Sequence, residues 1–537
     1  MTCRLLWVRA WLSRHLHRRS RRLHAAGAAL ALGALTTLGL VVRLRVLHSA
    51  AVLNADEAIE GLMALHISRG QHFPAFFYGQ PYFGALEAYL GALWFRLAGF
   101  EPLHIQLFPV LFSTLLVPLM YRLGALLLNR YTGLVAAALV AVPPAPLARL
   151  FVSAAGGYAL ALSLHMLALV LALECLRRSS ARGRRQSPLV PAVGFALVSG
   201  LTIWVWQPYL AVFPLLLVVV VAASPQLRTP VAAAGLLYVC VLGALPLVLF
   251  NIREPLATLS ALQKNTVFTG ETVRPGRPGH ALQLLWVALG GGYESFGGGN
   301  PLLALLAALG PPALLLAATG DDIFARRPGL EALSPTRVGA ILLAAGLAGA
   351  GVAHATARHL LPPALLCWLA GAAMLVRLSR HALLPAGVTA VLVWLNASGY
   401  RPGTLAFQDF VAGLAEVRET IAVLDAHGLR AGYGDYWSAY PLTYLTGERI
   451  VVAPSLPTLW GGPFDRYPAY VEQVRRAERP FLLVEQRCIS LPQLQERLAS
   501  SGQRVELVPS GRWLLAIPHS ADAAAVIHAY AAAPLPC

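Results

Sequence analysis

Long apolar segments recur along this 537-residue chain, and they constrain its fold more than any other feature. The first covers residues 24–46, and the others cover 105–128, 132–150, 157–176, 188–205, 208–223, 231–251, 300–319, 338–352, 360–377 and 382–398. A helix of about 20 apolar residues spans the hydrocarbon core of a bilayer. Charged residues make up only 12% of the chain, which excludes an ordinary soluble enzyme. The sequence therefore predicts a mainly α-helical, polytopic membrane helix bundle with about eleven spans.

The positive charge of the chain predicts its orientation in the membrane. A net charge of +17 would suggest nucleic-acid binding in a soluble protein, but here the arginines cluster between the apolar segments. The clusters fall on one side of the predicted bilayer, at Arg4–Arg22, Arg122, Arg130, Arg177–Arg185, Arg228, Arg326–Arg337 and Arg377–Arg380. Such loops stay in the cytoplasm. We expect an integral cell-membrane protein with a retained first helix, a cytoplasmic N-terminus and an extracytoplasmic C-terminus, whose partner is the lipid bilayer and not nucleic acid.

Three domains follow from this layout: a basic cytoplasmic N-terminus (1–23), a transmembrane domain (24–399) and an extracytoplasmic domain (400–537). The outer loop 48–104 carries a segment, residues 81–98, that contains Glu87 and Arg96 and is predicted to lie as an amphipathic helix in the outer interface. Residues 400–537 alternate helix and strand patterns, which predicts a small α/β domain. No glycine-rich nucleotide motif occurs in it.

The six cysteines show no Cys-x-x-Cys pairing, so the sequence indicates no metal or redox motif. Cys488 and Cys537 lie in the outer domain, where they either pair or remain as two thiols. In the same domain the segment Tyr433–Trp437 either binds a saccharide or docks onto the membrane domain.

The first outer loop opens with an acidic pair, Asp56 and Glu57. Asn54 followed by Glu57 three residues later predicts a capping box, which places both acids in the first turn of a helix. Acidic residues stabilise a helix N-terminus, so a purely structural role explains them equally well. The two acids also lie at the outer end of a membrane helix, just past Arg43, Arg45 and His48, where a base could face a phosphate bound by these cations. Alternatively, the cations extend to the lipid headgroups.

This arrangement resembles the polytopic glycosyltransferases of the C superfamily, namely family 39 and its relatives, the protein O-mannosyltransferases and the lipid A aminoarabinose transferases. The shared features are one span after a short cytoplasmic segment, Asp-Glu opening a long outer loop, a Gly-x-Pro element before an interfacial helix, and an outer C-terminal domain. The resemblance covers about the first 250 residues by pattern and the rest by layout. It implies that Asp56 is the catalytic carboxylate and Glu57 its acidic neighbour.

The resemblance also suggests residues that bind the substrate or the lipid phosphate. In the segment Tyr78-Gly79-Gln80-Pro81-Tyr82, a neutral Gln80 replaces the lysine that is frequent in relatives, so the charge of the phosphate must be neutralised elsewhere. The second outer loop, from Arg149 to Tyr158, lacks the acid that relatives often carry, which argues against a metal site. Residues 358–362 resemble the Arg-aromatic-Leu-Leu-Pro element of these transferases, with His359 in place of the aromatic residue, which makes Arg358 and His359 candidates for the phosphate. Arg45 and Lys264 are further candidates because of their positions, at the outer end of the first span and in an outer loop.

The predicted function is transfer of a sugar from a polyprenyl-phosphate donor to a glycan, lipid or protein acceptor on the extracytoplasmic face. Asp56 would act as general base in an inverting displacement, without a cofactor or metal. Two alternatives are a transporter or flippase of lipid-linked sugars and a non-catalytic envelope-assembly subunit. The first would place charges at mid-membrane in matched halves, a pattern that the sequence lacks.

Overall fold

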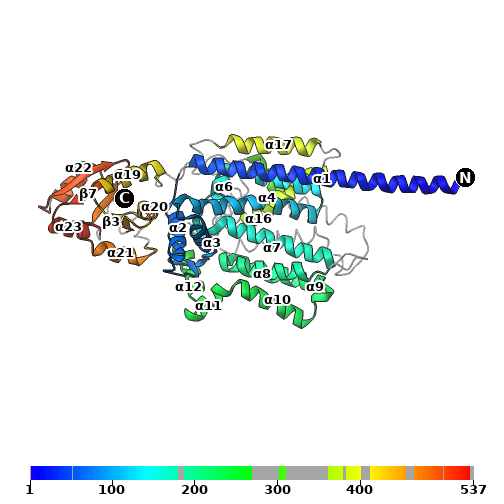
Figure 1. Ribbon diagram of the computed structural model, residues 1–537, viewed down its shortest axis with the longest axis horizontal. Helices are drawn as coiled ribbons and strands as arrows, with labels where there is room; N and C mark the ends of the chain where they lie inside the picture. The colour runs from blue at the N-terminus through cyan, green and yellow to red at the C-terminus, as the bar shows by residue number, and fades with distance from the viewer. Residues whose placement is uncertain are drawn as a thin grey trace.

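The structure is a computed structural model that describes residues 2–50, 52–179, 187–268, 301–309, 361–378, 383–400, 412–454, 465–499 and 501–531. Roughly parallel helices form a bundle, and a smaller α/β domain lies at one end of it (Figure 1). Helices α2 (Ala55–Ser68) and α3 (Leu86–Ala98) lie between these two parts. The chain is therefore mainly helical, with the short helices of the first loop at the junction.

The bundle consists of apolar helices. Its described helices are α1 (Thr2–Ala50), α4 (Leu107–Leu127), α5 (Arg130–Ala141), α6 (Ala145–Leu150), α7 (Tyr158–Ser179), α8 (Leu189–Val205), α9 (Phe213–Ala223), α10 (Pro230–Gly243), α11 (Leu245–Arg253), α12 (Ala257–Phe268), α16 (Leu361–Leu378) and α17 (Leu383–Ser398). Three stretches, Ala25–Ser49, Pro102–Leu127 and Tyr158–Ser179, are long and apolar enough to cross a membrane. The predicted span 338–352 and most of 300–319 lie outside the described residues.

Two of the predicted spans are broken helices. The apolar segment 132–150 divides into α5 and α6 at Pro143 and Pro144, because proline cannot continue the hydrogen-bond pattern of a helix. The segment 231–251 divides into α10 and α11, which meet at an angle of 73° next to Pro246. Apolar composition alone predicted continuous helices here, and the prolines determine where they break.

Arg43 is a structural residue of the bundle, so neither a phosphate site nor snorkelling to lipid headgroups, the two alternatives left open by the sequence, describes it. Its side chain is fully buried in α1. The guanidinium donates to Ser113 Oγ at 2.8 Å and to the carbonyls of Gly39 at 2.9 Å and Val140 at 3.1 Å. Val140 and Ala141 end α5, where backbone carbonyls lack partners within the helix, so Arg43 caps that helix.

The first outer loop folds onto the end of the bundle. Strand β1 (Phe76–Phe77) pairs antiparallel with β2 (Gln80–Gly84), and Phe83 bridges to Trp206 at the end of α8. The helix predicted for residues 81–98 therefore begins only at Leu86, because residues 80–84 are extended. Gly84 permits this contact, since a Cβ there would lie 2.6 Å from the carbonyl oxygen of Trp204.

The C-terminal domain contains a five-stranded sheet in the order β4-β3-β5-β7-β6. Strands β4, β3 and β5 are parallel, whereas β7 pairs antiparallel with β5 and β6. The elements are α19 (Leu414–Ala426), β3 (Ala431–Gly434), α20 (Tyr436–Leu445), β4 (Val451–Pro454), α21 (Pro468–Arg475), β5 (Phe481–Glu485), α22 (Leu491–Ala499), β6 (Val505–Ser510), β7 (Trp513–Pro518) and α23 (Ala521–Ala531). Their order follows the sequence pattern, with α23 as an additional helix.

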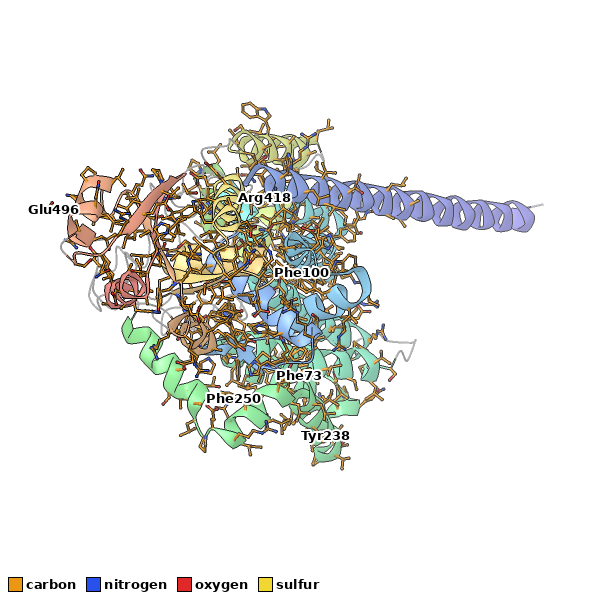
Figure 2. The ribbon with its side chains drawn as sticks, turned by 60° about the vertical axis from the view of Figure 1, so that its left-hand side comes forward. Phe73, Phe100, Tyr238, Phe250, Arg418 and Glu496 are labelled. Atoms are coloured by element: carbon orange, nitrogen blue, oxygen red, sulfur yellow. The ribbon has the colours of Figure 1, made fainter. Side chains whose placement is uncertain are left out.

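One apolar core joins the C-terminal domain to the first outer loop. It contains residues of α2 and α3 together with three tyrosines of α20, Tyr436, Tyr440 and Tyr444. Phe100, which Figure 2 labels, packs edge-on against Tyr444 with ring centroids 5.7 Å apart. Because burial of apolar surface is the main force in domain association, this shared core holds the α/β domain against α2.

Cys488 of the C-terminal domain is disulfide-bonded. Cys537 lies outside the described residues, so the proposed pairing of these two cysteines stays a prediction.

Candidate functional site

The start of α2 positions the acidic pair. Asn54 Oδ1 accepts a hydrogen bond from the backbone N–H of Glu57 at 2.9 Å, and Glu57 Oε2 accepts one from the N–H of Asn54 at 2.9 Å. The predicted capping box is thus confirmed. It fixes the first turn of α2 and with it the position of Asp56.

Glu57 is held on both oxygens. Its Oε1 accepts from the backbone N–H of Ala154 at 3.1 Å and from Gln106 Nε2 at 3.4 Å. Burial raises the pKa of the carboxyl, and the hydrogen bonds from Asn54 and Ala154 lower it. Glu57 therefore ties α2 to the second outer loop, and its observed contacts are those of a structural residue.

Asp56 faces the C-terminal domain. It is half-exposed, and the hydroxyl of Tyr436 donates a hydrogen bond to its Oδ1. Tyr436 begins α20, whose N-cap Asp435 accepts from the N–H of Trp437 at 2.8 Å. Burial and the charge of Asp56 raise the pKa of Tyr436, so the hydroxyl keeps its proton and remains a donor. The segment Tyr433–Trp437 thus docks onto the first outer loop.

A cation of the C-terminal domain lies beside this pair. The guanidinium carbon of Arg466 is 5.8 Å from the ring centroid of Tyr436, and its charge interacts with Asp56 and Tyr82. Burial lowers the pKa of Arg466, but interactions with Tyr436 and Asp56 outweigh this, and the net shift is upward. Arg466 is therefore a stable positive charge at the site. Arg466 was not identified from the sequence, because no local pattern distinguishes it from other loop arginines.

The Tyr78–Tyr82 segment packs against Arg466. Gly79 has a φ of 68°, and a Cβ there would lie 3.2 Å from Arg466 Cδ, so the arginine packs directly on this turn. Gln80 is half-buried at the start of β2. Burial raises the pKa of Tyr82 to about 12, and the charge of Arg466 opposes that shift. Gln80 and Tyr82 thus lie on the turn and strand that flank Arg466.

Two further carboxylates, Glu60 and Glu87, are buried next to the acidic pair. Glu60 Oε1 and both carboxyl oxygens of Glu87 lack a hydrogen-bond partner within the described part of the chain. Burial raises the pKa of Glu60 to about 8, and that of Glu87 is raised by burial and by the charges of Glu60 and Glu57. Both therefore retain protons at neutral pH. Glu87, whose charge favoured an interfacial helix over a membrane span for residues 81–98, has a buried side chain.

Sequence spacing offered a signal for Glu60, since it follows Asp56 by one helical turn and shares its helix face. Glu87 gave none, because its partners come from other segments. A Cβ on Gly157 of the second outer loop would lie 3.5 Å from Glu87 Oε2. Over the described ranges, no three His, Cys, Asp or Glu side chains are grouped to hold a metal ion.

Tyr78 takes part in a second contact between the loop and the C-terminal domain. His66 lies between the hydroxyl of Tyr78 and Glu448 Oε1, each 2.8 Å from a ring nitrogen. Tyr470 donates to Glu448 at 2.9 Å, and Arg69 forms an ion pair with the same carboxylate. Tyr78, His66, Glu448, Tyr470 and Arg69 thus form one polar network, which we call the His66–Glu448 latch.

The other predicted site residues are distributed over the bundle. Arg45 is exposed on α1, and Arg149, at the end of α6, interacts with the charge of Glu57. Tyr158 starts α7 and packs edge-on against Phe83 at 5.9 Å. Lys264 belongs to α12, which packs against β2, but its side chain is outside the described set. Arg358 and His359 also lie outside the described residues.

Comparison with solved structures identifies the fold. ArnT from Cupriavidus metallidurans in the apo state aligns with a TM-score of 0.61 and 13% identity, covering 92% of this chain and 98% of that one. ArnT bound to undecaprenyl phosphate aligns with a TM-score of 0.58 and 14% identity, covering 90% and 97%. The Archaeoglobus fulgidus oligosaccharyltransferase, in complex with Zn and sulfate, aligns with a TM-score of 0.52 and 12% identity, covering 88% and 69%.

No family model matches the chain, and no curated protein sequence matches it. The structural similarities extend over most of its length, so this chain shares the fold of ArnT and of the Archaeoglobus fulgidus oligosaccharyltransferase.

Proposed function

We propose that this protein is a membrane glycosyltransferase that moves a sugar from a polyprenyl-phosphate donor to an acceptor on the extracytoplasmic face. The observation that carries the proposal is Asp56, a half-exposed carboxylate at a capped helix start, with Tyr436 and Arg466 beside it. It lies in a fold shared with ArnT, a protein solved with bound undecaprenyl phosphate. A base next to a cation is the arrangement that transfer from a lipid phosphate requires.

The reaction is a single displacement. An acceptor hydroxyl forms a bond to the anomeric carbon of the sugar and gives its proton to Asp56. The bond between that carbon and the phosphate oxygen breaks, and its electron pair leaves with the lipid phosphate. Attack from the side opposite the leaving group inverts the anomeric centre. No nucleotide site is needed, because the donor is held by the membrane.

The neighbouring acids are assigned other roles. Glu57 is occupied by hydrogen bonds from Asn54, Ala154 and Gln106. Glu60 and Glu87 are buried and keep their protons, so they are poor proton acceptors at neutral pH. Asp56 is the carboxylate of this group that an acceptor can reach.

The experiment is substitution of Asp56 by asparagine. Membranes that contain the protein and its native lipid-linked sugars are incubated, and the release of free polyprenyl phosphate is followed by mass spectrometry. Loss of a general base slows such a reaction by about 10²- to 10⁴-fold. Glu472→Gln is the matched control, because Glu472 is an exposed acid that pairs only with Arg475 and Arg476 among the described residues. A well-folded Asp56→Asn variant that retains the full rate would refute the assignment.

A further inference from the structure

A negative charge at Asp56 opposes the binding of an anionic donor. The buried Glu60 and Glu87 keep their protons and neither add to this charge nor offset it. The adjacent turn offers Gln80, an amide that hydrogen-bonds a phosphate but does not neutralise it. A phosphate that approaches Asp56 therefore requires a cation close by.

Arg466 has the position that this cation needs. Its charge interacts with Asp56, and its side chain packs against Gly79, the residue before Gln80. It is half-buried, which weakens the screening of its charge by water. Arg466 of the C-terminal domain thus lies beside the Tyr78–Tyr82 segment of the first outer loop.

The backbone around Arg466 is fixed. Its N–H donates to the hydroxyl of Tyr440 at 2.6 Å, and the next residue, Tyr467, donates from its N–H to Asp465 Oδ1 at 3.1 Å. Tyr440 is fully buried in α20, the helix that also presents Tyr436 to Asp56. These bonds hold the backbone, and the contacts with Tyr436 and Gly79 hold the side chain, so the charge is in place without a substrate. Preorganised charge is the most effective kind for stabilising a leaving group.

We propose that Arg466 binds the phosphate of the lipid-linked donor, so that the C-terminal domain completes the active site. This inference rests on the proposed function and adds the residue that holds the donor. A guanidinium matches two phosphate oxygens at once and keeps its charge at all physiological pH values. As the bond between the sugar and the phosphate breaks, Arg466 stabilises the negative charge that develops on the lipid phosphate.

The absence of a side chain at Gly79 and the ring of Tyr436 together position the side chain of Arg466. A Cβ at position 79 would lie 3.2 Å from Arg466 Cδ, and the ring centroid of Tyr436 lies 5.8 Å from the guanidinium carbon. Tyr436 is a positioning residue, since it contacts both Asp56 and Arg466. One tyrosine thereby sets the relative position of the base and the phosphate-binding cation.

The test uses the full-length protein in nanodiscs with undecaprenyl phosphate as the probe. Arg466→Met keeps most of the side-chain volume and removes the charge, and Arg475→Met, an exposed arginine of the same domain, is the matched control. We expect Arg466→Met to weaken binding of undecaprenyl phosphate by about 10-fold or more and Arg475→Met to leave it unchanged. Asp56→Asn should still bind the probe, because it removes the base and keeps the cation.

A rescue experiment separates binding from folding. Gln80 lies next to the turn that Arg466 contacts, so Gln80→Lys in the Arg466→Met background should restore part of the lost binding. The inference would be overturned if Arg466→Met bound undecaprenyl phosphate as well as the wild type. It would also be overturned if the loss of affinity came with a lower unfolding temperature and Gln80→Lys did not restore binding. Either result would leave the proposed function standing. If the wild-type protein does not bind the probe, both fail.

Discussion

Gly61 lies where α2 packs against Tyr444 of the C-terminal domain, and its replacement by alanine tests how the domain is docked. A Cβ at this position would lie 2.1 Å from Cζ of Tyr444 and within 2.6 Å of both Cε atoms. The ring has little freedom to move, because Tyr444 is fully buried and its hydroxyl donates to the carbonyl of Pro102 at 2.7 Å. Relief of the clash therefore requires a shift of α20 away from α2.

The magnitude follows from three contributions. Adding a methyl group to a well-packed core costs about 1–3 kcal/mol, and loss of the Tyr444–Pro102 hydrogen bond costs about 1 kcal/mol more. Alanine is favoured over glycine inside a helix by about 1 kcal/mol, which offsets the second contribution. We expect Gly61→Ala to destabilise the docked state by about 1–3 kcal/mol.

The assay is thermal unfolding of the detergent-solubilised protein, followed by tryptophan fluorescence. Gly61→Ala should lower the transition temperature, whereas Gly33→Ala should not, because a Cβ at Gly33 meets nothing within 4 Å. In a Tyr444→Ala background the ring is absent, and the cost of Gly61→Ala should disappear. An equal cost in both backgrounds would refute the steric explanation.

Two predictions concern pH. Burial raises the pKa of Glu448, but hydrogen bonds from His66 and Tyr470 and the charge of Arg69 outweigh burial and hold this pKa below 4.5. The contribution of Glu448 to the free energy of unfolding is therefore present above pH 4.5 and is lost as the pH falls through the folded-state pKa. Glu448→Gln should remove this acid-dependent loss, and an unchanged loss in the unfolding temperature would contradict the latch. Glu87 has a folded-state pKa raised above 4.5, so its stabilisation is complete below that pH and is lost as the pH rises through the folded-state value. Glu87→Gln should flatten the alkaline side of the unfolding-temperature profile, and an unaltered slope would argue against a protonated buried carboxyl.

Features that depend on neighbours along the chain were predictable from the sequence. The capping box of α2 needs only Asn54 and Glu57, three residues apart, and the structure contains both of its hydrogen bonds. The apolar segments predicted the helices because their periodicity and length are local properties. Pro143 and Pro246 interrupt two of these segments, and the helices break there. The prediction weighted the apolar composition of each segment above its prolines and therefore expected continuous helices.

Features that depend on the packing of distant segments were not predictable. Tyr436 and Asp56 are separated by 380 positions, and Tyr470 and His66 by 404. The pattern around Arg466 resembles that of any arginine in a loop, and only the docking of α20 onto α2 brings it to Gly79. The burial of Glu87 was not predictable for the same reason, because the residues that cover it come from other segments.

The arrangement of the acids separates their roles. Glu57 is fully hydrogen-bonded, and Glu60 and Glu87 keep their protons because they are buried next to one another. Asp56 differs from them in being half-exposed and in facing a tyrosine donor and an arginine. Under the proposed function, these different environments leave Asp56 as the single base of the site. Since Tyr436 and Arg466 both come from the C-terminal domain, the proposed reaction depends on the docking that Gly61 permits.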